Sequence, residues 1–350
     1  MKASLQRLLV DPIQRRRLRL ESAESDCGEI LSGNLHAEDG TPYPIRNGIP
    51  RLVSTADTGQ LQTAVTFGFK WKRRESYDSQ ASRAVVLAWS TEKYGFTSLE
   101  DWATYFSRRQ RVLDLGCGSG FSSSLWLDSP FWTGGGMWVG VDISEAIDVA
   151  WQRLQGVPNT HFIQADALQL PFPDESFDTI SSEGVLHHTP STRAALLSAA
   201  RVLARGGEFH FYVYRKKGPI REFTDDYIRE RIAPLSDEEA WDAMRTLTRL
   251  GQSLADLNAT VDVPEDVPLL GIKAGRHDVQ RLIYWHFAKL YWNNALSFEE
   301  NVHVNFDWYR PQYAQRQTAD QVRAWCDEAG LSIQRFHEQE SGFAVRAIKD

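Results

Sequence analysis

Between residues 108 and 215, short runs of apolar residues alternate with longer segments in which apolar residues recur at helical spacing. Short apolar runs bounded by turn residues are typical of strands that are buried on both faces. The expected strands cover 111–115, 137–142, 160–164, 177–181 and 208–214, and the expected helices cover 121–127, 145–154 and 193–203. Strands that alternate with helices favour an α/β fold, a doubly wound and mostly parallel sheet with helices on both faces.

The chain before this region divides into two parts with different patterns. Residues 1–55 carry turn signals between short apolar runs and predict a small β-rich domain. Residues 56–107 predict a helical linker or cap, with a helix over 82–94 that ends at Gly95. The turn signals of the first part are Gly33-Asn34, Asp39-Gly40 and Asn47-Gly48.

Residues 216–317 break the alternation of strand and helix. They are charged and helical over 221–232 and 237–257, and they become aromatic over 284–292. A helical, aromatic-rich insertion between strands predicts a lid over a substrate site. The chain has 12 tryptophans, which either build a core or line a pocket that excludes water. Several lie outside the central region, at Trp71, Trp89, Trp102, Trp285, Trp292 and Trp308.

Residues 318–350 predict a helix and two strands that complete the central domain. Thr318 is a helix cap and Gly330 is a helix stop. Two strands follow, over 332–338 and 343–348, and a short turn joins them. We expect them to form an antiparallel hairpin at the edge of the central sheet.

The composition excludes some classes of protein. The chain has 350 residues, of which 42% are hydrophobic and 24% charged, and this suits a sizeable globular core. Its net charge of −7 gives no overall basic field, so nucleic acid is not favoured as a partner. The basic run at 70–74 is read as a solvated face, as such runs usually are.

The cysteines and the apolar stretches bear on the compartment. Cys27, Cys117 and Cys326 form no CxxC pair, which fits a reducing compartment without a disulfide framework. The first residues lack the apolar core of a signal peptide, and no apolar stretch approaches the ~18 residues of a membrane span. We therefore expect a cytoplasmic protein that acts on a small molecule.

A glycine-rich turn follows the first strand of the central region, in the sequence Val112-Leu-Asp-Leu-Gly-Cys-Gly-Ser-Gly120. Glycine lets the backbone turn sharply and lets a ligand approach without a clash with Cβ atoms. The spacing is GxGxG, unlike the GxGxxG of dinucleotide-binding enzymes, and no Lys-Ser/Thr pair follows, which excludes a P-loop.

Carboxylates lie at the ends of three strands of this region. They are Asp114 before the glycine turn, Asp142 after the second strand and Asp166 after the third. An acid at the end of the second strand of a doubly wound sheet accepts hydrogen bonds from ribose hydroxyls. Each acid alone suits a helix cap or a turn equally well, but acids at successive strand ends favour a nucleotide-like ligand.

These motifs, in this order, resemble those of class I S-adenosylmethionine-dependent methyltransferases. The matching segments are VLDLGCGSG (112–120), GVDIS (140–144), FIQADALQLPFPDESFD (162–178) and GVLHHT (184–189). The resemblance implies a Rossmann-like, seven-stranded sheet whose last strand is antiparallel, and it implies S-adenosylmethionine as the cofactor. It says almost nothing of the acceptor.

The same resemblance implies cofactor contacts. The amino-acid end of the cofactor would face Asp114, Gly116, Cys117, Gly118 and Gly120. Asp142 would bind the ribose, Ile143 would pack near the adenine, and Asp166 and Ala167 would contact the adenine edge.

Two further cofactor contacts are open to a second interpretation. Glu183 either lies near the sulfonium or amino group or points to solvent. The segment 67–71 resembles the part of related small-molecule and glycan methyltransferases that closes over the cofactor, which makes Trp71 a candidate contact. By composition alone this segment suits a core equally well.

The N-terminal domain resembles the small zinc-ribbon domain that accompanies or activates some methyltransferases. The resemblance runs from Leu8-Leu-Val-Asp-Pro to Tyr43-Pro-Ile-Arg-Asn-Gly-Ile-Pro50. Where that family has cysteines, this chain has Asp11, Gln14 and His36, and Cys27 is unpaired. A structural zinc site needs four Cys or His ligands, so we expect a degenerate ribbon without zinc. We expect no other metal site, because the histidines show no ligand spacing with acids on one helix face.

Two adjacent histidines are the candidate catalytic bases. His187 and His188 follow the fourth strand, where the resemblance places the reacting methyl group. Histidine titrates near neutral pH, so either one can remove a proton from the acceptor, and His188 is preferred. The alternative is that one or both pack against the following turn or cap it.

Candidate acceptor contacts come from the end of the fifth strand and from the insertion. A cation at Arg215 or Arg221 suits a substrate carboxylate or phosphate, although an exposed charged strand end explains it as well. The segment 303–313 is read as irregular, with polar groups among aromatic ones, and suits either a pocket or a structural tether. The acceptor candidates are Tyr214, Arg215, Arg221, Asn305, Asp307, Tyr309 and Tyr313.

Methyl transfer to a small molecule at oxygen, nitrogen or carbon is the leading functional hypothesis. One alternative uses the same cofactor but reacts its aminocarboxypropyl arm, by transfer or cyclisation, and releases methylthioadenosine. The other is a non-catalytic partner protein, which the acids at the three strand ends do not favour.

Overall fold

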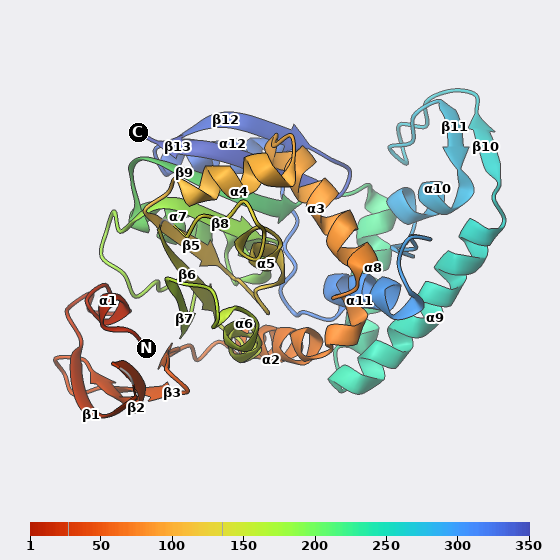
Figure 1. Cartoon of the computed structure of the whole chain (residues 1–350). Coiled ribbons are helices and arrows are strands. Elements are labelled where there is room, and N and C mark those ends of the chain that lie inside the picture. The colour runs from red at the N-terminus through yellow and green to blue at the C-terminus, as the bar shows by residue number, and fades with distance from the viewer. Residues whose placement is uncertain (27, 135) are drawn as a thin grey trace.

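An eleven-stranded sheet forms the centre of the computed structural model, which describes residues 1–26, 28–134 and 136–350 (Figure 1). Its strand order is β1-β2-β3-β4-β7-β6-β5-β8-β9-β13-β12. From β4 to β9 in this order, neighbouring strands are parallel. The core strands are β5 (Arg111–Leu115), β6 (Met137–Asp142), β7 (Thr160–Ala165), β8 (Phe177–Glu183), β9 (Leu203–Tyr214), β12 (Leu331–Glu338) and β13 (Gly342–Lys349).

The sheet confirms the predicted fold class and adds strands to it. The seven expected core strands are present, and β13, the last strand of the chain, is antiparallel to both β9 and β12. The predicted C-terminal hairpin forms, but only β12 lies at the sheet edge. β13 lies inside the sheet, where it pairs with β9 and β12, and its Phe343, Val345 and Ala347 are buried on one face.

Alternating residues of the strands build two cores, one on each face of the sheet. In β9, Phe209 and Phe211 pack with residues of α7 (Thr192–Val202) and α12 (Ala319–Glu328). Tyr212 and Tyr214 point to the other face and join residues of α4, α5 and α6. This period of two follows from the pleat of a strand. The helices of the second face are α3 (Gln80–Tyr94), α4 (Leu99–Ser107), α5 (Phe121–Leu127) and α6 (Ala146–Leu154).

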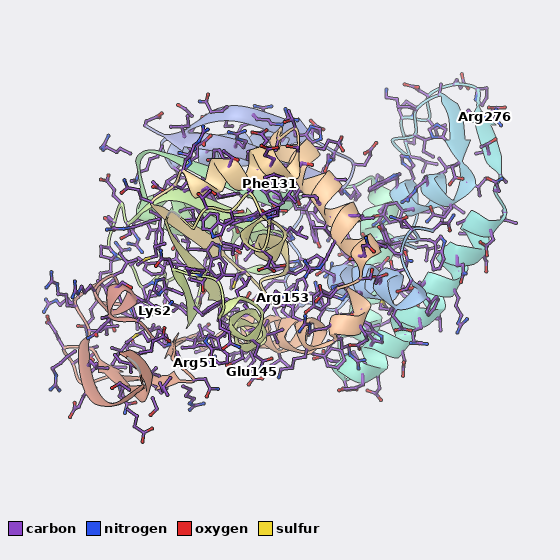
Figure 2. All side chains as sticks on the ribbon, in the orientation of Figure 1. Lys2, Arg51, Phe131, Glu145, Arg153 and Arg276 are labelled. Carbon is purple, nitrogen blue, oxygen red and sulfur yellow. The ribbon has the colours of Figure 1, made fainter. Side chains whose placement is uncertain are left out.

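The N-terminal strands continue the central sheet. β4 pairs in parallel with β7, so the small β-rich part shares backbone hydrogen bonds with the core. Arg51 of β4 strengthens this junction through an ion pair with Asp148 of α6, with a shortest N–O distance of 2.6 Å (Figure 2). The elements of this part are α1 (Ala3–Gln6), β1 (Arg19–Asp26), β2 (Glu29–His36), β3 (Pro42–Arg46) and β4 (Ile49–Leu52).

The helical linker consists of α2 (Thr58–Lys72), a short 3-10 turn over 74–76, and the helices α3 and α4. α3 ends as expected, because Gly95 adopts a left-handed conformation with φ of 77°. The side chain of Ser79 caps the start of this helix. The linker thus returns the chain to β5 while leaving α2 across the carboxyl ends of the core strands (Figure 1).

The insertion between β9 and α12 is helical, as predicted, and lies beside the core (Figure 1). It also contains an antiparallel pair, β10 and β11, which the sequence pattern did not predict. Figure 2 shows Arg276 at the end of this ribbon, far from the N-terminal strands. The elements are α8 (Pro219–Ile232), α9 (Asp237–Asp256), β10 (Thr260–Val263), β11 (Gly275–Asp278), α10 (Val279–His286) and α11 (Phe298–Tyr309).

The prediction of an irregular segment over 303–313 is wrong for most of its length, since α11 extends to Tyr309. A capping box starts this helix, in which Ser297 and Glu300 bond each other's backbone N–H groups. Val302 and Phe306, four residues apart, are fully buried on one face. The polar residues His303 and Asn305 made this segment look irregular in the sequence, but both are buried in α11.

The C-terminal helix confirms its predicted cap. Thr318 forms a capping box with Gln321, and Gly330 follows the helix with φ of 64°. Cys117 and Cys326 are free and buried, and Cys27 lies outside the described residues. Across the described ranges, no helix combines the length and the apolar character that crossing a membrane requires.

Candidate active site

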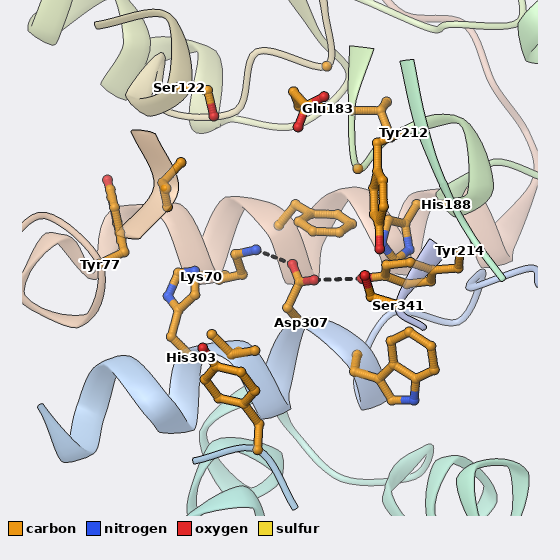
Figure 3. Close-up of a pocket in the computed structure, with 18 of the residues that line it drawn as sticks. Lys70, Tyr77, Ser122, Glu183, His188, Tyr212, Tyr214, His303, Asp307 and Ser341 are labelled. Carbon is orange, nitrogen blue, oxygen red and sulfur yellow. Dashed lines mark hydrogen bonds and ion pairs between the residues drawn. The ribbon is translucent and has the colours of Figure 1, made fainter. Parts of the chain in front are cut away.

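A cavity of about 540 Å³ lies at the carboxyl ends of the parallel strands, where they meet the insertion (Figure 3). Asp142 ends β6, Glu183 ends β8 and Tyr214 ends β9, and all three line the cavity. Lys70 of α2 and Asp307 of α11 also line it. This edge of a doubly wound sheet is where such folds bind their ligands.

The glycine turn leads from β5 into α5 through three residues in the left-handed region. The φ angles are 76° at Gly116, 54° at Gly118 and 69° at Gly120. A Cβ atom at Gly118 would lie 2.8 Å from Nε1 of Trp71, and one at Gly116 would lie 2.2 Å from the side chain of Val185. Conformation and crowding therefore both require glycine here. Gly116 lines the cavity, as does Trp71.

Asp142 is a buried carboxylate at the junction of the glycine turn and the cavity. It accepts the N–H of Gly118 at 2.8 Å, and the N–H and the hydroxyl of Ser144 at 2.8 and 2.6 Å. Burial raises the pKa of Asp142, and the bonds from Ser144 and Gly118 oppose this shift. Ile143, the next residue, also lines the cavity. A carboxylate here can accept further hydrogen bonds from ligand hydroxyls.

The other two predicted acids are not among the lining residues. Asp114 accepts a hydrogen bond from Ser123 at 2.6 Å, and burial raises its pKa to about 7. Asp166 accepts a 2.8 Å bond from Nε2 of Gln60, and burial raises its pKa. Gln60 itself lines the cavity beside Ala167. Cys117, Gly118 and Gly120 likewise support the turn without lining the cavity.

One face of α2 forms a wall of the cavity. Its lining residues are spaced three or four apart, which places them on the same side of the helix. Asp57 caps the start of the helix by accepting the N–H of Gln60 at 2.7 Å. The lining residues of α2 are Gln60, Thr63, Phe67, Lys70 and Trp71.

Glu183 lines the cavity and is held by partners from α3. It forms an ion pair with Lys93 and accepts a hydrogen bond from the hydroxyl of Tyr94. The Lys93 side chain is fully buried, and its Nζ lies 3.1 Å from the ring centroid of Trp89. These contacts keep Glu183 at the cavity wall, where its side chain is 16% exposed.

Lys70, Asp307 and Tyr214 form a polar chain across the cavity (Figure 3). Lys70 forms an ion pair with Asp307, which also accepts a 2.9 Å hydrogen bond from the Tyr214 hydroxyl. Burial alone would raise the pKa of Asp307, but Lys70, His188 and Lys289 together hold that pKa well below its usual range. Asp307 is therefore a fixed negative charge at the cavity wall.

The two histidines have different surroundings. His187 is fully buried, does not line the cavity, and lies with its ring centroid 3.7 Å from that of Tyr214. His188 lines the cavity, and its Nδ1 lies 2.6 Å from the carbonyl oxygen of Tyr313. Because a carbonyl only accepts, Nδ1 carries the proton and Nε2 keeps a lone pair. Nε2 has no hydrogen-bond partner among the described residues, and burial lowers the pKa of His188 to about 4.

Four predicted acceptor contacts lie outside the cavity lining and hold the fold together instead. Arg215 forms an ion pair of 3.1 Å with Glu338 at the sheet edge. Asn305 is fully buried and accepts the N–H of Tyr291 at 2.9 Å, which is the structural tether considered above. The other two donate hydroxyl hydrogen bonds of 3.0 Å, Tyr309 to Asp225 and Tyr313 to Asp57. The candidates that line the cavity are Tyr214, Arg221 and Asp307.

Several lining residues carry no signal in a single sequence. Lys70 belongs to the basic run read as a solvated face, yet it is 3% exposed. Lys217 and Lys289 lie in loops of the insertion, where no local pattern marks them as buried. The clustering of tryptophans was a usable signal, since four of the six noted above line the cavity. They are Trp71, Trp89, Trp285 and Trp308, and the further aromatic lining residues include Tyr77, Tyr212, Tyr284 and Tyr291.

The polar residues of the N-terminal part make hydrogen bonds. Asp11 accepts the Tyr43 hydroxyl at 2.8 Å, and Gln14 donates to Asp39 at 2.6 Å. His36 lies 3.5 Å from Glu21. Within the ranges that the structure describes, no group of three or more His, Cys, Asp or Glu residues is arranged to hold a metal ion.

The lining residues fit S-adenosylmethionine. Asp142 offers a carboxylate for hydroxyls, Gly116 adds backbone without a side chain, and Trp71, which packs on Gly118, supplies apolar surface together with Ile143. Residues 113–211 match the family model of the methyltransferase domain. This part of the chain is therefore similar to a methyltransferase domain.

Relatives of this domain are methyltransferases. The chain is 39% identical over 148 residues to the uncharacterized methyltransferase YcgJ of Bacillus subtilis, covering 40% of this chain and 56% of that protein. It is 37% identical over 99 residues to a demethylmenaquinone methyltransferase of Clavibacter sepedonicus, covering 28% and 38%. It is 28% identical over 130 residues to the phthiotriol/phenolphthiotriol dimycocerosates methyltransferase of Mycobacterium leprae, covering 37% and 47%. The chain thus spans about half the length of the curated relatives it matches, or less.

One of the solved structures similar to this chain is also a methyltransferase by name. The magnesium protoporphyrin IX methyltransferase of Synechocystis PCC 6803 aligns with 85% of this chain and 100% of its own, at a TM-score of 0.44 and 15% identity.

Proposed function

We propose that this protein is a methyltransferase that transfers the methyl group of S-adenosylmethionine to a small-molecule acceptor bound beneath the helical insertion. The observation that carries the proposal is one continuous cavity. It joins Asp142 and Trp71, on the cofactor side, to Asp307, Tyr214 and Trp308 on the insertion side.

When bound, the cofactor supplies a methyl group that its sulfonium has already activated, so the protein mainly positions the acceptor and excludes water. The aromatic walls serve the second task. Asp307 positions the acceptor, because Lys70 and Tyr214 fix its orientation and its carboxylate can accept a hydrogen bond from the acceptor.

We assign removal of the acceptor's proton to His188 rather than to His187. His188 is uncharged near neutral pH because its pKa is lowered to about 4, and its Nε2 is free to accept a proton. His187 is absent from the cavity lining. Nε2 of His188 is covered in the present conformation, so a small side-chain shift accompanies this step.

Names of two relatives support a small-molecule acceptor, since they refer to demethylmenaquinone and to phthiotriol compounds. The net charge of −7 favours such an acceptor over nucleic acid. A cytoplasmic location stays a prediction.

The N-terminal part is proposed to be a metal-free, ribbon-like support for β7. The resemblance to zinc ribbons places Asp11 and Gln14 where that family has cysteines, and the hydrogen bonds that both side chains make support the proposal. One zinc ion per chain in the purified protein would contradict it.

Mass spectrometry of the nucleoside product tests the proposed reaction. Purified protein is incubated with S-adenosylmethionine, alone and with a small-molecule extract of cells. The proposal predicts S-adenosylhomocysteine only when the extract is present. Methylthioadenosine formed from the cofactor alone would instead mean that the aminocarboxypropyl arm reacts.

A further inference from the structure

Three cationic residues that line the insertion side of the cavity lie around the ring of Trp308. Nζ of Lys289 lies 4.5 Å from the ring centroid of Trp308, and Nζ of Lys217 lies 5.8 Å from it. The guanidinium carbon of Arg221 lies 5.4 Å from the same centroid. All four residues line the cavity.

The carboxylates around this cluster do not balance its charge. Arg221 forms a 2.9 Å ion pair with Asp225, whose oxygens also accept bonds from Trp308 and Tyr309. Nζ of Lys217 donates to the backbone carbonyls of Glu340 and Ser341, the latter at 3.0 Å. In the described part of the chain, neither Lys217 nor Lys289 has a carboxylate within ion-pair distance.

Lys289 is the most telling member of the cluster. Only 6% of its surface is exposed, and its hydrogen bonds among the described residues join its backbone N–H and carbonyl to Tyr309. Asp307, the carboxylate that most raises the pKa of Lys289, is already paired with Lys70. A buried ammonium group without a counter-charge is costly, so an anion bound beside it would stabilise its charged form.

The acid–base properties of the two lysines agree with this geometry. Burial lowers the pKa of Lys289 to about 7, with Arg221 and Arg229 lowering it further and Asp307 and Asp225 opposing. Burial lowers the pKa of Lys217 to about 6, with Arg221, Arg215 and Lys289 adding to the effect and Asp225 opposing. An anion bound between them would raise both pKa values, so binding would take up protons.

We propose that Lys217, Arg221 and Lys289 around Trp308 form a subsite for an anionic group of the acceptor, a carboxylate or a phosphate. The inference rests on the proposed function, because it concerns the acceptor end of the same cavity. Tyr284, Trp285 and Tyr291 also line this end. Their rings suit an apolar or aromatic body attached to the anion.

Calorimetry with matched probes tests the subsite. The full-length protein, loaded with S-adenosylhomocysteine, is titrated at pH 6 with 2-naphthoate, 2-naphthyl phosphate and the neutral 2-naphthamide. We expect the better of the two anions to bind at least about tenfold more tightly than the amide, as a charge-assisted hydrogen bond allows. The anion that binds more tightly identifies the acceptor group, and titration in two buffers of different ionisation enthalpy should reveal proton uptake.

Variants assign the effect to the lysines. Lys217→Met and Lys289→Met should each remove most of the preference for the anion, whereas Lys216→Met, the exposed neighbour, should retain it. Equal affinity for the amide, no binding of either anion, or a preference that survives both substitutions would overturn the proposal. The wild-type comparison stands even if one variant fails to fold. Loading of the protein with S-adenosylhomocysteine separates this outcome from failure of the proposed function. If the proposed function is wrong, S-adenosylhomocysteine itself will not bind.

Discussion

Lys70 and Asp307 are 237 residues apart in the chain and form an ion pair across the cavity. Lys70 comes from α2, before the core, and Asp307 comes from α11, in the insertion. The pair joins two segments that line the cavity (Figure 3). Tyr214 donates to the second oxygen of Asp307, so both oxygens of this carboxylate are held at the cavity wall.

Replacing Asp307 should therefore affect both stability and turnover. Asp307→Asn leaves Lys70 buried without its counter-charge, which should lower the free energy of unfolding by about 1–3 kcal/mol. Turnover should fall by at least about tenfold, because the acceptor loses its charged partner. Denaturant unfolding and a product assay measure the two effects. Adding Lys70→Met should restore stability but not turnover, and Asp266→Asn, whose pair with Lys273 is exposed, should change neither. Normal turnover in Asp307→Asn would contradict the role given to this residue.

Gly118→Ala should weaken cofactor binding through crowding. Its Cβ would lie 2.8 Å from Trp71, whereas a Cβ at Gly134 would meet nothing within 4 Å. Both glycines have positive φ, 54° and 71°, so each substitution costs about 1–2 kcal/mol of backbone energy. Gly134→Ala is thus a matched control for strain. Calorimetric titration with S-adenosylhomocysteine should give a dissociation constant about tenfold higher for Gly118→Ala only. Equal affinities would show that Trp71 does not form part of the cofactor site.

The histidine variants should separate catalysis from packing. His188→Gln should lower kcat by roughly 10²-fold or more if His188 removes the proton, as general-base residues usually do. The pH dependence of kcat/KM should rise near pH 4 rather than near 6.5, because burial lowers the pKa of His188 to about 4. His161→Gln, far from the cavity lining, should leave kcat unchanged. Unchanged kcat in His188→Gln would end the assignment.

The same histidines should make the fold less stable in acid. Burial lowers the pKa of His161 and of His188 to about 4, below the ~6.5 of an unfolded chain. The unfolded state therefore binds the proton first as the pH falls. The free energy of unfolding is unaffected above pH ~6.5, falls as the pH decreases to ~4 and is not lowered further below that. The total decrease is up to ~3 kcal/mol per histidine. Urea unfolding at pH 7 and pH 5 should show a smaller loss in His161→Gln than in the wild type. An identical loss would mean that this residue is not buried in its neutral form.

The core and the cofactor side could be predicted because their signals are local. The strands over 111–115 and 137–142 have the predicted bounds. The three glycines of the GxGxG turn have the positive φ angles that a sharp turn of this composition suggests. Asp142 is the last residue of its strand, so the topology of parallel strands brings it to the cavity. The resemblance of the ordered motifs to those of class I methyltransferases then predicted S-adenosylmethionine as the cofactor.

The acceptor side could not be predicted in the same way because its geometry depends on distant segments. Nothing near Lys70 in the sequence indicates its partner Asp307, and the basic run around it suggested a solvated face. Asn305 and Tyr309 lie in the predicted segment, but the helical turn of α11 points them to other partners. Lys289 lies in a loop and becomes notable only once its burial is known.

The transfer of a labelled methyl group tests the central claim most directly. The protein is incubated with a cell extract and S-adenosylmethionine carrying a trideuterated methyl group, and small molecules are compared by mass spectrometry with an Asp307→Asn control. The account predicts a new product that carries all three deuterium atoms, together with S-adenosylhomocysteine, and far less of both in the variant. Deuterium found only in methylthioadenosine would contradict methyl transfer.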